Sequence, residues 1–249
     1  MNWWIVVYSF ACVFGAAIVR GYSGFGFSLL AITSLSLALP PSAVIPPIFM
    51  LEVAASLSLM PSVWRDVHWK ALALLWLGCA LGTPLGVWFL ATVPAAPMKI
   101  ALAIAVIAAA SLLGSGYVRK SMPNAGETVL TGGVAGLLNG AFGIVAPPVV
   151  VFFFGSPAGA AISRASLIAF FIGTDGMGLA FLAREGLVTS DGLYRFLMLV
   201  PVLLAGQWLG ARSFKKSDPG EFRRWALRIL AALALLTGLQ GVLALASAS

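Results

Sequence analysis

Charged side chains are scarce in this sequence: Asp, Glu, Lys and Arg make up 9% of its 249 residues, while hydrophobic residues make up 61%. Soluble domains carry roughly 25% charged residues, so this chain cannot cover a surface that faces water. Its mean hydropathy of +1.02 excludes the soluble classes of protein. The composition instead predicts an all-α polytopic membrane protein.

Histidine and cysteine are nearly absent, with one His and two Cys in the chain. Cys12 and Cys79 both lie in apolar stretches, without metal-binding spacing or a disulfide framework, and we interpret them as small packing residues. His68 follows an apolar segment and is interpreted as a solvated loop residue. A membrane-embedded enzyme needs convergent nucleophiles, acids or metal ligands. We therefore expect no enzyme, no catalytic residue, no metal and no cofactor.

The amino terminus lacks a basic side chain, and no small-residue cleavage pattern follows its apolar run, so we expect no removable signal peptide. Trp3, Trp4, Trp64 and Trp69 fit interfacial aromatic belts. The net charge of +7 comes from basic residues confined to short loops. Cytoplasmic retention of these loops explains the charge, and we expect no nucleic-acid partner.

Long apolar segments are what the sequence does contain. About 20 apolar residues suffice to cross a hydrocarbon core of about 30 Å. Two further apolar regions, 3–39 and 128–155, are interrupted by Gly and Pro. The uninterrupted segments predict membrane helices over 43–61, 71–91, 99–117, 160–182, 193–212 and 225–246.

The second half of the chain repeats the first in the order of its breaks and spans. Sliding the chain along itself lays Gly15 on Gly132, the pair 25–26 on 142–143, and Pro40 on Pro157; further on, Gly82 and Gly86 fall on Gly206 and Gly210. We predict two membrane repeats, 1–120 and 121–249. Each consists of one broken or re-entrant segment plus three transmembrane helices, giving about eight nominal spans.

Loop charges predict the orientation of the repeats. If each broken segment crosses an even number of times, loops 62–70, 118–127 and 212–224 lie on one side and hold most of the loop Lys and Arg residues. The positive-inside rule places that side in the cytoplasm. The repeats are then inverted, both termini lie outside, and the expected location is the bacterial inner membrane. Inverted repeats with interrupted helices recur in secondary transporters.

The interrupted segments 20–28 and 136–148 are the predicted binding region. Their glycines, with Pro147 and Pro148, disfavour continuous helix, and unpaired backbone at membrane depth is tolerated only against protein or a water-filled cavity. Half-helix amino termini suit an anion such as a carboxylate, sulfite or sulfonate. The alternative is that these glycines only let helices pack closely, which is our interpretation of the Gly82/Gly86 and Gly206/Gly210 pairs.

These residues resemble the sulfite exporter TauE/SafE family of membrane transporters. The segment 24–30, Gly-Phe-Gly-Phe-Ser-Leu-Leu, is similar to the family's first-half motif, and 139–143, Asn-Gly-Ala-Phe-Gly, running into Pro147 and Pro148, is similar to the second. At 144–146 the chain has Ile-Val-Ala where many relatives have glycines. The resemblance covers nearly the whole chain. It implies export of sulfite or organosulfonates, with proton coupling as an accompanying hypothesis.

Few charges lie inside the predicted spans. Arg164 is a candidate clamp for a sulfonate or carboxylate, a role that family resemblance at 164–167 strengthens, and the alternative is a side chain that snorkels to the headgroups. Arg20 carries the same two alternatives. Asp175 is a candidate proton carrier, the partner of a cation on another helix, or part of the lining of a water-filled vestibule near the outer mouth. Glu52 is a second candidate proton carrier.

The sequence thus predicts a secondary transporter that exports small anions by alternating access, embedded in the lipid bilayer, with no oligomeric state implied. An anion channel and a non-transporting structural membrane partner remain the alternatives. The candidate substrate-binding residues are Arg20, Tyr22, Ser23, Gly24, Phe25, Gly26, Asn139, Gly140, Phe142, Gly143, Pro147, Ser163, Arg164 and Ser166, and the candidate proton-coupling residues are Asp175 and Glu52.

Overall fold

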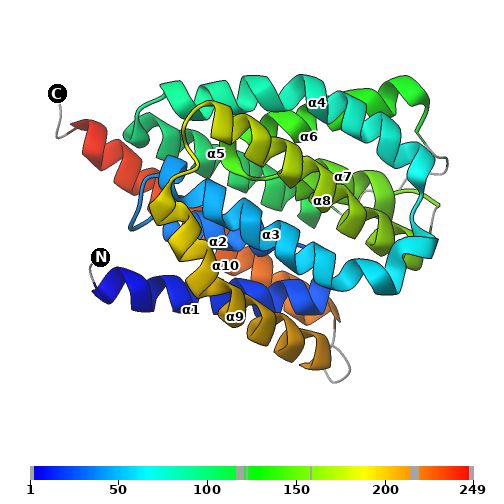
Figure 1. Ribbon diagram of the computed structural model, residues 1–249, viewed down its shortest axis with the longest axis horizontal. Helices are drawn as coiled ribbons and strands as arrows, with labels where there is room; N and C mark the ends of the chain where they lie inside the picture. The colour runs from blue at the N-terminus through cyan, green and yellow to red at the C-terminus, as the bar shows by residue number, and fades with distance from the viewer. Residues whose placement is uncertain (1–2, 116–120, 122, 158, 214–218, 247–249) are drawn as a thin grey trace.

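The computed structural model describes residues 3–115, 121, 123–157, 159–213 and 219–246. This described part is helical throughout, apart from its connections, and contains ten α-helices (Figure 1). The helices are α1 Trp3–Ser23, α2 Phe27–Leu35, α3 Pro41–Val63, α4 Trp69–Thr92, α5 Ala95–Gly114, α6 Ala125–Phe142, α7 Ala146–Phe154, α8 Ala160–Arg184, α9 Ser190–Ser213 and α10 Pro219–Ala246, with a 3-10 turn, η1, at Trp64–Asp66.

The six predicted long helices are present, with ends that differ by up to six residues from the expected bounds. Residues 116 and 117, the predicted end of the helix 99–117, lie outside the described residues. The interrupted regions resolve into the pairs α1–α2 and α6–α7. Six helices among the described residues are long and apolar enough to cross a membrane, and the apolar stretch Ala231–Ala246 of α10 is shorter. The six candidate spans are Trp3–Tyr22, Pro41–Asp66, Trp69–Thr92, Ala95–Gly114, Ala161–Arg184 and Ser190–Arg212.

Glycines in the left-handed conformation interrupt both broken segments. Gly24 and Gly26 have φ of 82° and 89°, and Gly143 has φ of 68°, a region open to glycine at little cost. The Gly143 N–H donates to the Asn139 carbonyl at 2.8 Å, and a left-handed residue that makes this bond is the αL end of a helix. The expectation that the second break includes Gly140 is therefore wrong, because α6 runs through it to Phe142.

Proline plays a different part from the one predicted. Pro147 and Pro148 do not prolong the break, because they occupy the first turn of α7, where the missing N–H has no helical partner to lose.

In the first half, α2 folds back along α1, since the Tyr8 hydroxyl donates to the Ser34 carbonyl at 2.7 Å. The first broken segment therefore forms a helical hairpin.

Small residues bring two helix pairs into close contact. A Cβ atom on Gly82 would collide with the Gly133 carbonyl of α6, and one on Gly86 would collide with the Leu137 carbonyl. Residue numbers rise together along this contact, so α4 and α6 run in the same direction. Gly206 and Gly210 of α9 face Phe14 and Ile18 of α1 in the same way. The interpretation of these glycine pairs as close-packing residues is confirmed.

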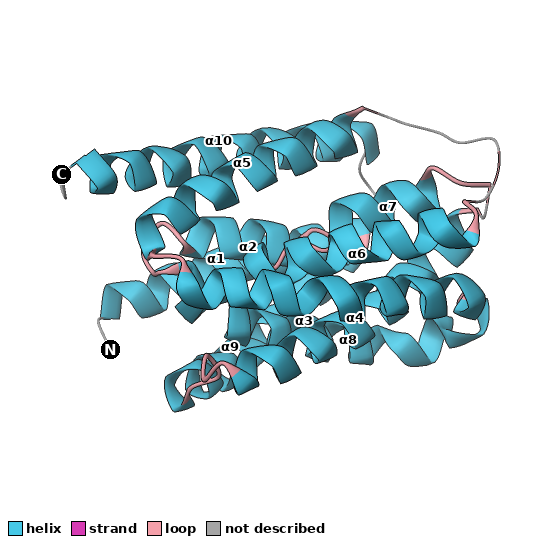
Figure 2. Cartoon of the chain, turned by 90° about the horizontal axis from the view of Figure 1, so that it is seen from above, coloured by secondary structure: helices cyan, strands magenta, loops and turns pink. Residues whose placement is uncertain are grey.

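The two helices of the α5–α10 pair run in opposite directions. Gly238 of α10 faces Ala103 of α5, and Gly241 faces Ile100; Figure 2 shows α5 and α10 together along one edge of the bundle. In the centre, α3 packs against α8. Both figures place the start of α1 and the end of α10 at the same end of the bundle.

Candidate functional site

A buried ion pair joins α1 to α3 in the interior of the bundle. Arg20 is 1% exposed and Glu52 is 2% exposed, and the Arg20 guanidinium is paired with the Glu52 carboxylate. Arg20 also donates to the Ser56 hydroxyl at 2.6 Å, and its guanidinium carbon lies 5.4 Å from the centre of the Phe171 ring. The structure therefore excludes the alternative that Arg20 snorkels to the headgroups.

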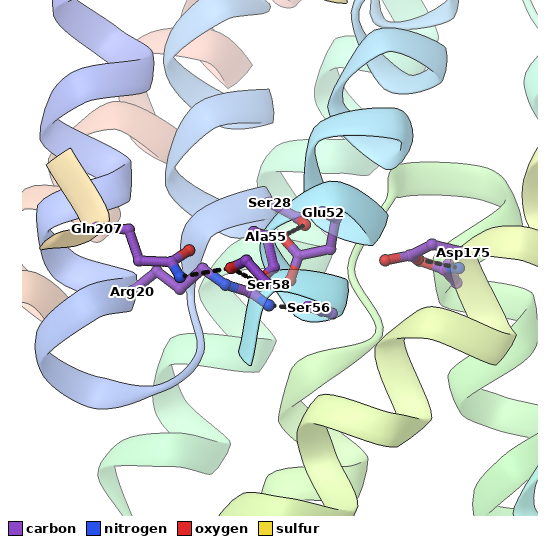
Figure 3. Close-up of polar contacts among 9 residues, drawn as sticks. Arg20, Ser28, Glu52, Ala55, Ser56, Ser58, Asp175 and Gln207 are labelled. Atoms are coloured by element: carbon purple, nitrogen blue, oxygen red, sulfur yellow. Dashed lines mark hydrogen bonds and ion pairs between the residues drawn. The ribbon is translucent and has the colours of Figure 1, made fainter. Parts of the chain in front are cut away.

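The same ion pair is attached to the first break. The second Glu52 oxygen accepts a hydrogen bond of 2.7 Å from the Ser28 hydroxyl, and Ser28 is the second residue of α2, directly after the left-handed Gly26. Figure 3 shows Ser28 and Arg20 converging on Glu52. Ser28 was absent from the predicted site, although it lies within the 24–30 motif, because the sequence does not show which helix its hydroxyl faces.

A small pocket lies between the two breaks. The first half contributes Gly26, Ser28, Leu29 and Glu52, and the second half contributes 143–146 and Phe171. In this conformation the pocket has room for about one water molecule. A larger ligand therefore needs the surrounding helices to separate.

Asp175 occupies a second buried polar position, on α8. It is 1% exposed, and its Oδ1 accepts a hydrogen bond of 2.9 Å from the Asn139 side-chain amide on α6. Asp175 Oδ2, Asn139 Oδ1 and Thr83 Oγ1 are buried without a hydrogen-bond partner in the part that the structure describes. Figure 3 shows Asp175 apart from the Arg20–Glu52 pair. The hydrogen-bond partner of Asp175 is thus an amide, whereas the sequence suggested a cation.

Arg164 lies at the surface, in the second turn of α8. Its Cγ and Nε atoms are 3.6 Å from the place that a Cβ on Gly24 would take, so its side chain lies over the first break. Its two serine neighbours have structural partners: Ser163 donates to the Phe153 carbonyl at 3.1 Å, and Ser166 accepts from the His68 N–H at 2.9 Å. Both serine hydroxyls anchor the start of α8.

The structure gives packing contacts for several of the other predicted residues. Tyr22 is buried, and the side chain of Ser23 lies outside the described residues. Gly140 packs against the backbone of α4. The rings of Phe25 and Phe142 pair with other aromatics: Phe25 with Phe154 at 6.5 Å, and Phe142 with Phe89 at 6.1 Å between centroids.

The scarce sulfur and imidazole groups serve the packing of the bundle. The buried Cys79 thiol donates to the Gly132 carbonyl at 3.1 Å. His68 is the N-cap of α4, since its Nδ1 accepts from the Ala71 N–H at 3.2 Å. Among the described residues, no three His, Cys, Asp or Glu side chains are grouped so that they could hold a metal ion.

Comparison with known proteins places the chain in a family. The family described as "Sulfite exporter TauE/SafE" matches residues 9–237. A curated relative, the "Probable sulfite/organosulfonate exporter TauE" of Cupriavidus necator, is 26% identical over 219 residues, which cover 85% of this chain and 84% of the relative. No solved structure matches the chain. This multi-pass helical protein belongs to the sulfite exporter TauE/SafE family.

Proposed function

We propose that this chain is a secondary transporter that exports small anions, namely sulfite, organosulfonates or carboxylates, by alternating access. The observation that carries the proposal is the pocket between the two breaks, which residues of both halves line. The relative from Cupriavidus necator, whose printed name is that of a sulfite/organosulfonate exporter, supports the substrate class. The pocket is too small for such an anion in this conformation, which fits an occluded state of the transport cycle.

The proposed architecture is two inverted repeats, 1–120 and 121–249, with about eight nominal spans and both termini outside. Each half consists of a long helix, a nine-residue helix and three long helices. Helix α1 packs on α9, while its counterpart α6 packs on α4, the counterpart of α9. The parallel α4–α6 contact and the opposed α5–α10 contact support opposite directions of the two halves. Inverted repeats meeting at a central site permit alternating access.

Anion binding in this proposal uses the amino-terminal ends of the two short helices. The pocket is lined by Gly26, at the start of α2, and by Val145 and Ala146, at the start of α7. The first turn of a helix has free N–H groups and the positive end of the helix dipole, so it stabilises an anion. In α7, Pro147 and Pro148 have no N–H, so this end contributes mainly its dipole, and the free N–H groups come from α2. Arg164 then receives the anion beside the first break, and Arg20 is the buried cation of the site.

Two buried carboxylates, Glu52 and Asp175, are the candidate proton carriers for coupling. The proposed location is the bacterial inner membrane, with the basic loops in the cytoplasm. An anion channel would use the same pore-lining groups, but it would not accumulate substrate against a gradient. A structural membrane protein would move no anion.

Counterflow in proteoliposomes tests the proposal. With the membrane potential held at zero by equal K⁺ concentrations on both sides and valinomycin, vesicles loaded with unlabelled sulfonate should transiently accumulate labelled sulfonate, which a channel and a structural protein cannot do. Replacing Arg164 with Leu should slow this uptake about tenfold or more, because a charge-assisted hydrogen bond to the anion is lost. Arg184→Leu is the matched control, because Arg184 is an equally exposed arginine at the other end of the same helix. Counterflow unchanged by Arg164→Leu would exclude the role of Arg164, and no counterflow by the native chain would exclude the transporter.

A further inference from the structure

The Arg20 guanidinium is buried, so its positive charge needs an anion beside it. Its side chain is fully buried, and Glu52 is its ion-pair partner among the described residues. The other charge that acts on it is Asp175. Removing the partner of a buried charge is strongly destabilising, because an uncompensated charge then stays in a low-dielectric interior. Any state of the protein in which Glu52 leaves Arg20 therefore requires another anion beside Arg20.

Glu52 also forms part of the wall of the pocket. Glu52, Ser28 and Phe171 all line it, whereas Arg20 lies behind them. Glu52 pairs with the Arg20 guanidinium and Phe171 lies 5.4 Å from it, while Ser28 donates to Glu52. An anion in the pocket thus meets the Glu52 carboxylate beside the cation that would attract it. As long as Glu52 is ionised, its charge repels that anion.

We propose that Glu52 is a built-in substitute for the substrate anion, and that substrate and Glu52 exchange places on Arg20 with uptake of one proton. The inference rests on the proposed transport function. As the anion reaches Arg20, a proton from water binds the Glu52 carboxylate, while Arg20 stays protonated. The site then has the same net charge with and without substrate. When the anion leaves, Glu52 releases the proton and pairs with Arg20 again.

Among the groups around Arg20, Glu52 is the one placed for this exchange. The neighbouring elements contribute the Ser28 hydroxyl from α2, Glu52 and Ser56 from α3, Phe171 and Asp175 from α8, and Gln207 from α9. Of these, Glu52 and Asp175 are the two carboxylates, the groups whose charge a proton can neutralise. Asp175 is held by the Asn139 amide and does not line the pocket. The exchange therefore assigns the proton to Glu52.

Calorimetry on the purified full chain measures the exchange directly. Methanesulfonate and 2-hydroxyethanesulfonate are suitable probes, because a sulfonate stays ionised and any proton taken up belongs to the protein. Titrations in buffers of different ionisation enthalpy should give about one proton bound per anion, and the affinity should fall about tenfold for each unit of rising pH. Glu52→Gln should bind the probe with no proton uptake and no pH dependence. Asp175→Asn removes the other candidate proton carrier, and the exchange predicts that this variant still takes up one proton per anion.

The possible outcomes distinguish failure of the exchange from failure of the transport proposal. Binding by the native chain without proton uptake would overturn the exchange and leave the transport proposal intact, whereas no binding of either probe would overturn both. Proton uptake that disappears in Asp175→Asn, or survives in Glu52→Gln, would also overturn the exchange. If Glu52→Gln does not fold, infrared difference spectra of the native chain and of Asp175→Asn serve instead. A protonated carboxylic acid band should appear in both on anion binding, and its absence would exclude the exchange.

Discussion

Arg20 and Glu52 are buried in the interior of the bundle, where either charge alone is costly, since removing one partner of a buried pair costs about 3–5 kcal/mol. The pair reduces this cost by direct contact. Ser28 and Ser56 supply further hydrogen bonds. Well-packed apolar residues would often be as stable as such a pair, which is why we assign the pair to function rather than to stability.

A double-mutant cycle on this pair separates the two contributions. Arg20→Met leaves Glu52 buried without its cation and should lower the free energy of unfolding by about 3–5 kcal/mol. Arg20→Met with Glu52→Gln removes both charges and keeps an acceptor for Ser28, so it should recover most of that stability and still transport no anion. Thermal unfolding and counterflow measure the two effects. A double variant as unstable as the single one would show that the charge balance is not what stabilises this site.

Individual site residues could be predicted from the sequence where a charged side chain lies in an otherwise apolar helix. Glu52 and Asp175 were singled out because carboxylates are rare in apolar helices, and both are buried. Their partners could not be predicted. Arg20 meets Glu52, and Asn139 meets Asp175, only because separate helices pack in one particular arrangement, which helical periodicity along the chain does not determine.

At the scale of the element, hydropathy and the Gly and Pro content predict which segments form helices and where helices are interrupted. They do not predict the residue at which a helix ends. Gly136, Gly140 and Gly143 all permit a left-handed turn. Only Gly143 adopts one. A Cβ on Gly136 or Gly140 would instead collide with the backbone of α4, so helix packing assigns those two glycines to the interface and leaves the third to end α6.

The aligned positions Gly15 and Gly132 give a matched test of this packing. A Cβ on Gly132 would collide with the Leu75 carbonyl, whereas one on Gly15 would meet nothing within 4 Å. Gly132→Ala should therefore destabilise the protein by about 1–3 kcal/mol through overpacking. Gly15→Ala should be neutral or stabilise it by up to about 1 kcal/mol, because alanine favours the helix. Equal shifts of the unfolding temperature in the two variants would contradict the close α4–α6 contact.

At the scale of the whole molecule, the central pair α3–α8 carries Glu52 and Asp175, and the paired breaks enclose the pocket beside it. Both halves line the pocket, so in the proposed transport cycle a movement of one half against the other would change access to the pocket. The charged loops predict which end of the bundle faces the cytoplasm. The proposed opposite directions of the two halves are supported by helix contacts that the sequence does not show directly.

Two acidic residues at equivalent helix ends test this topology. Asp66 follows α3 and Glu185 follows α8, and both are exposed. In a background with Cys12→Ser and Cys79→Ala, a membrane-impermeant maleimide applied to intact cells should label Glu185→Cys at once. It should label Asp66→Cys only after the membrane is permeabilised, because inverted repeats place the ends of α3 and α8 on opposite faces. Labelling of both positions from the same side would mean that the halves point the same way, and neither the common pocket between inverted repeats nor alternating access through it would then stand.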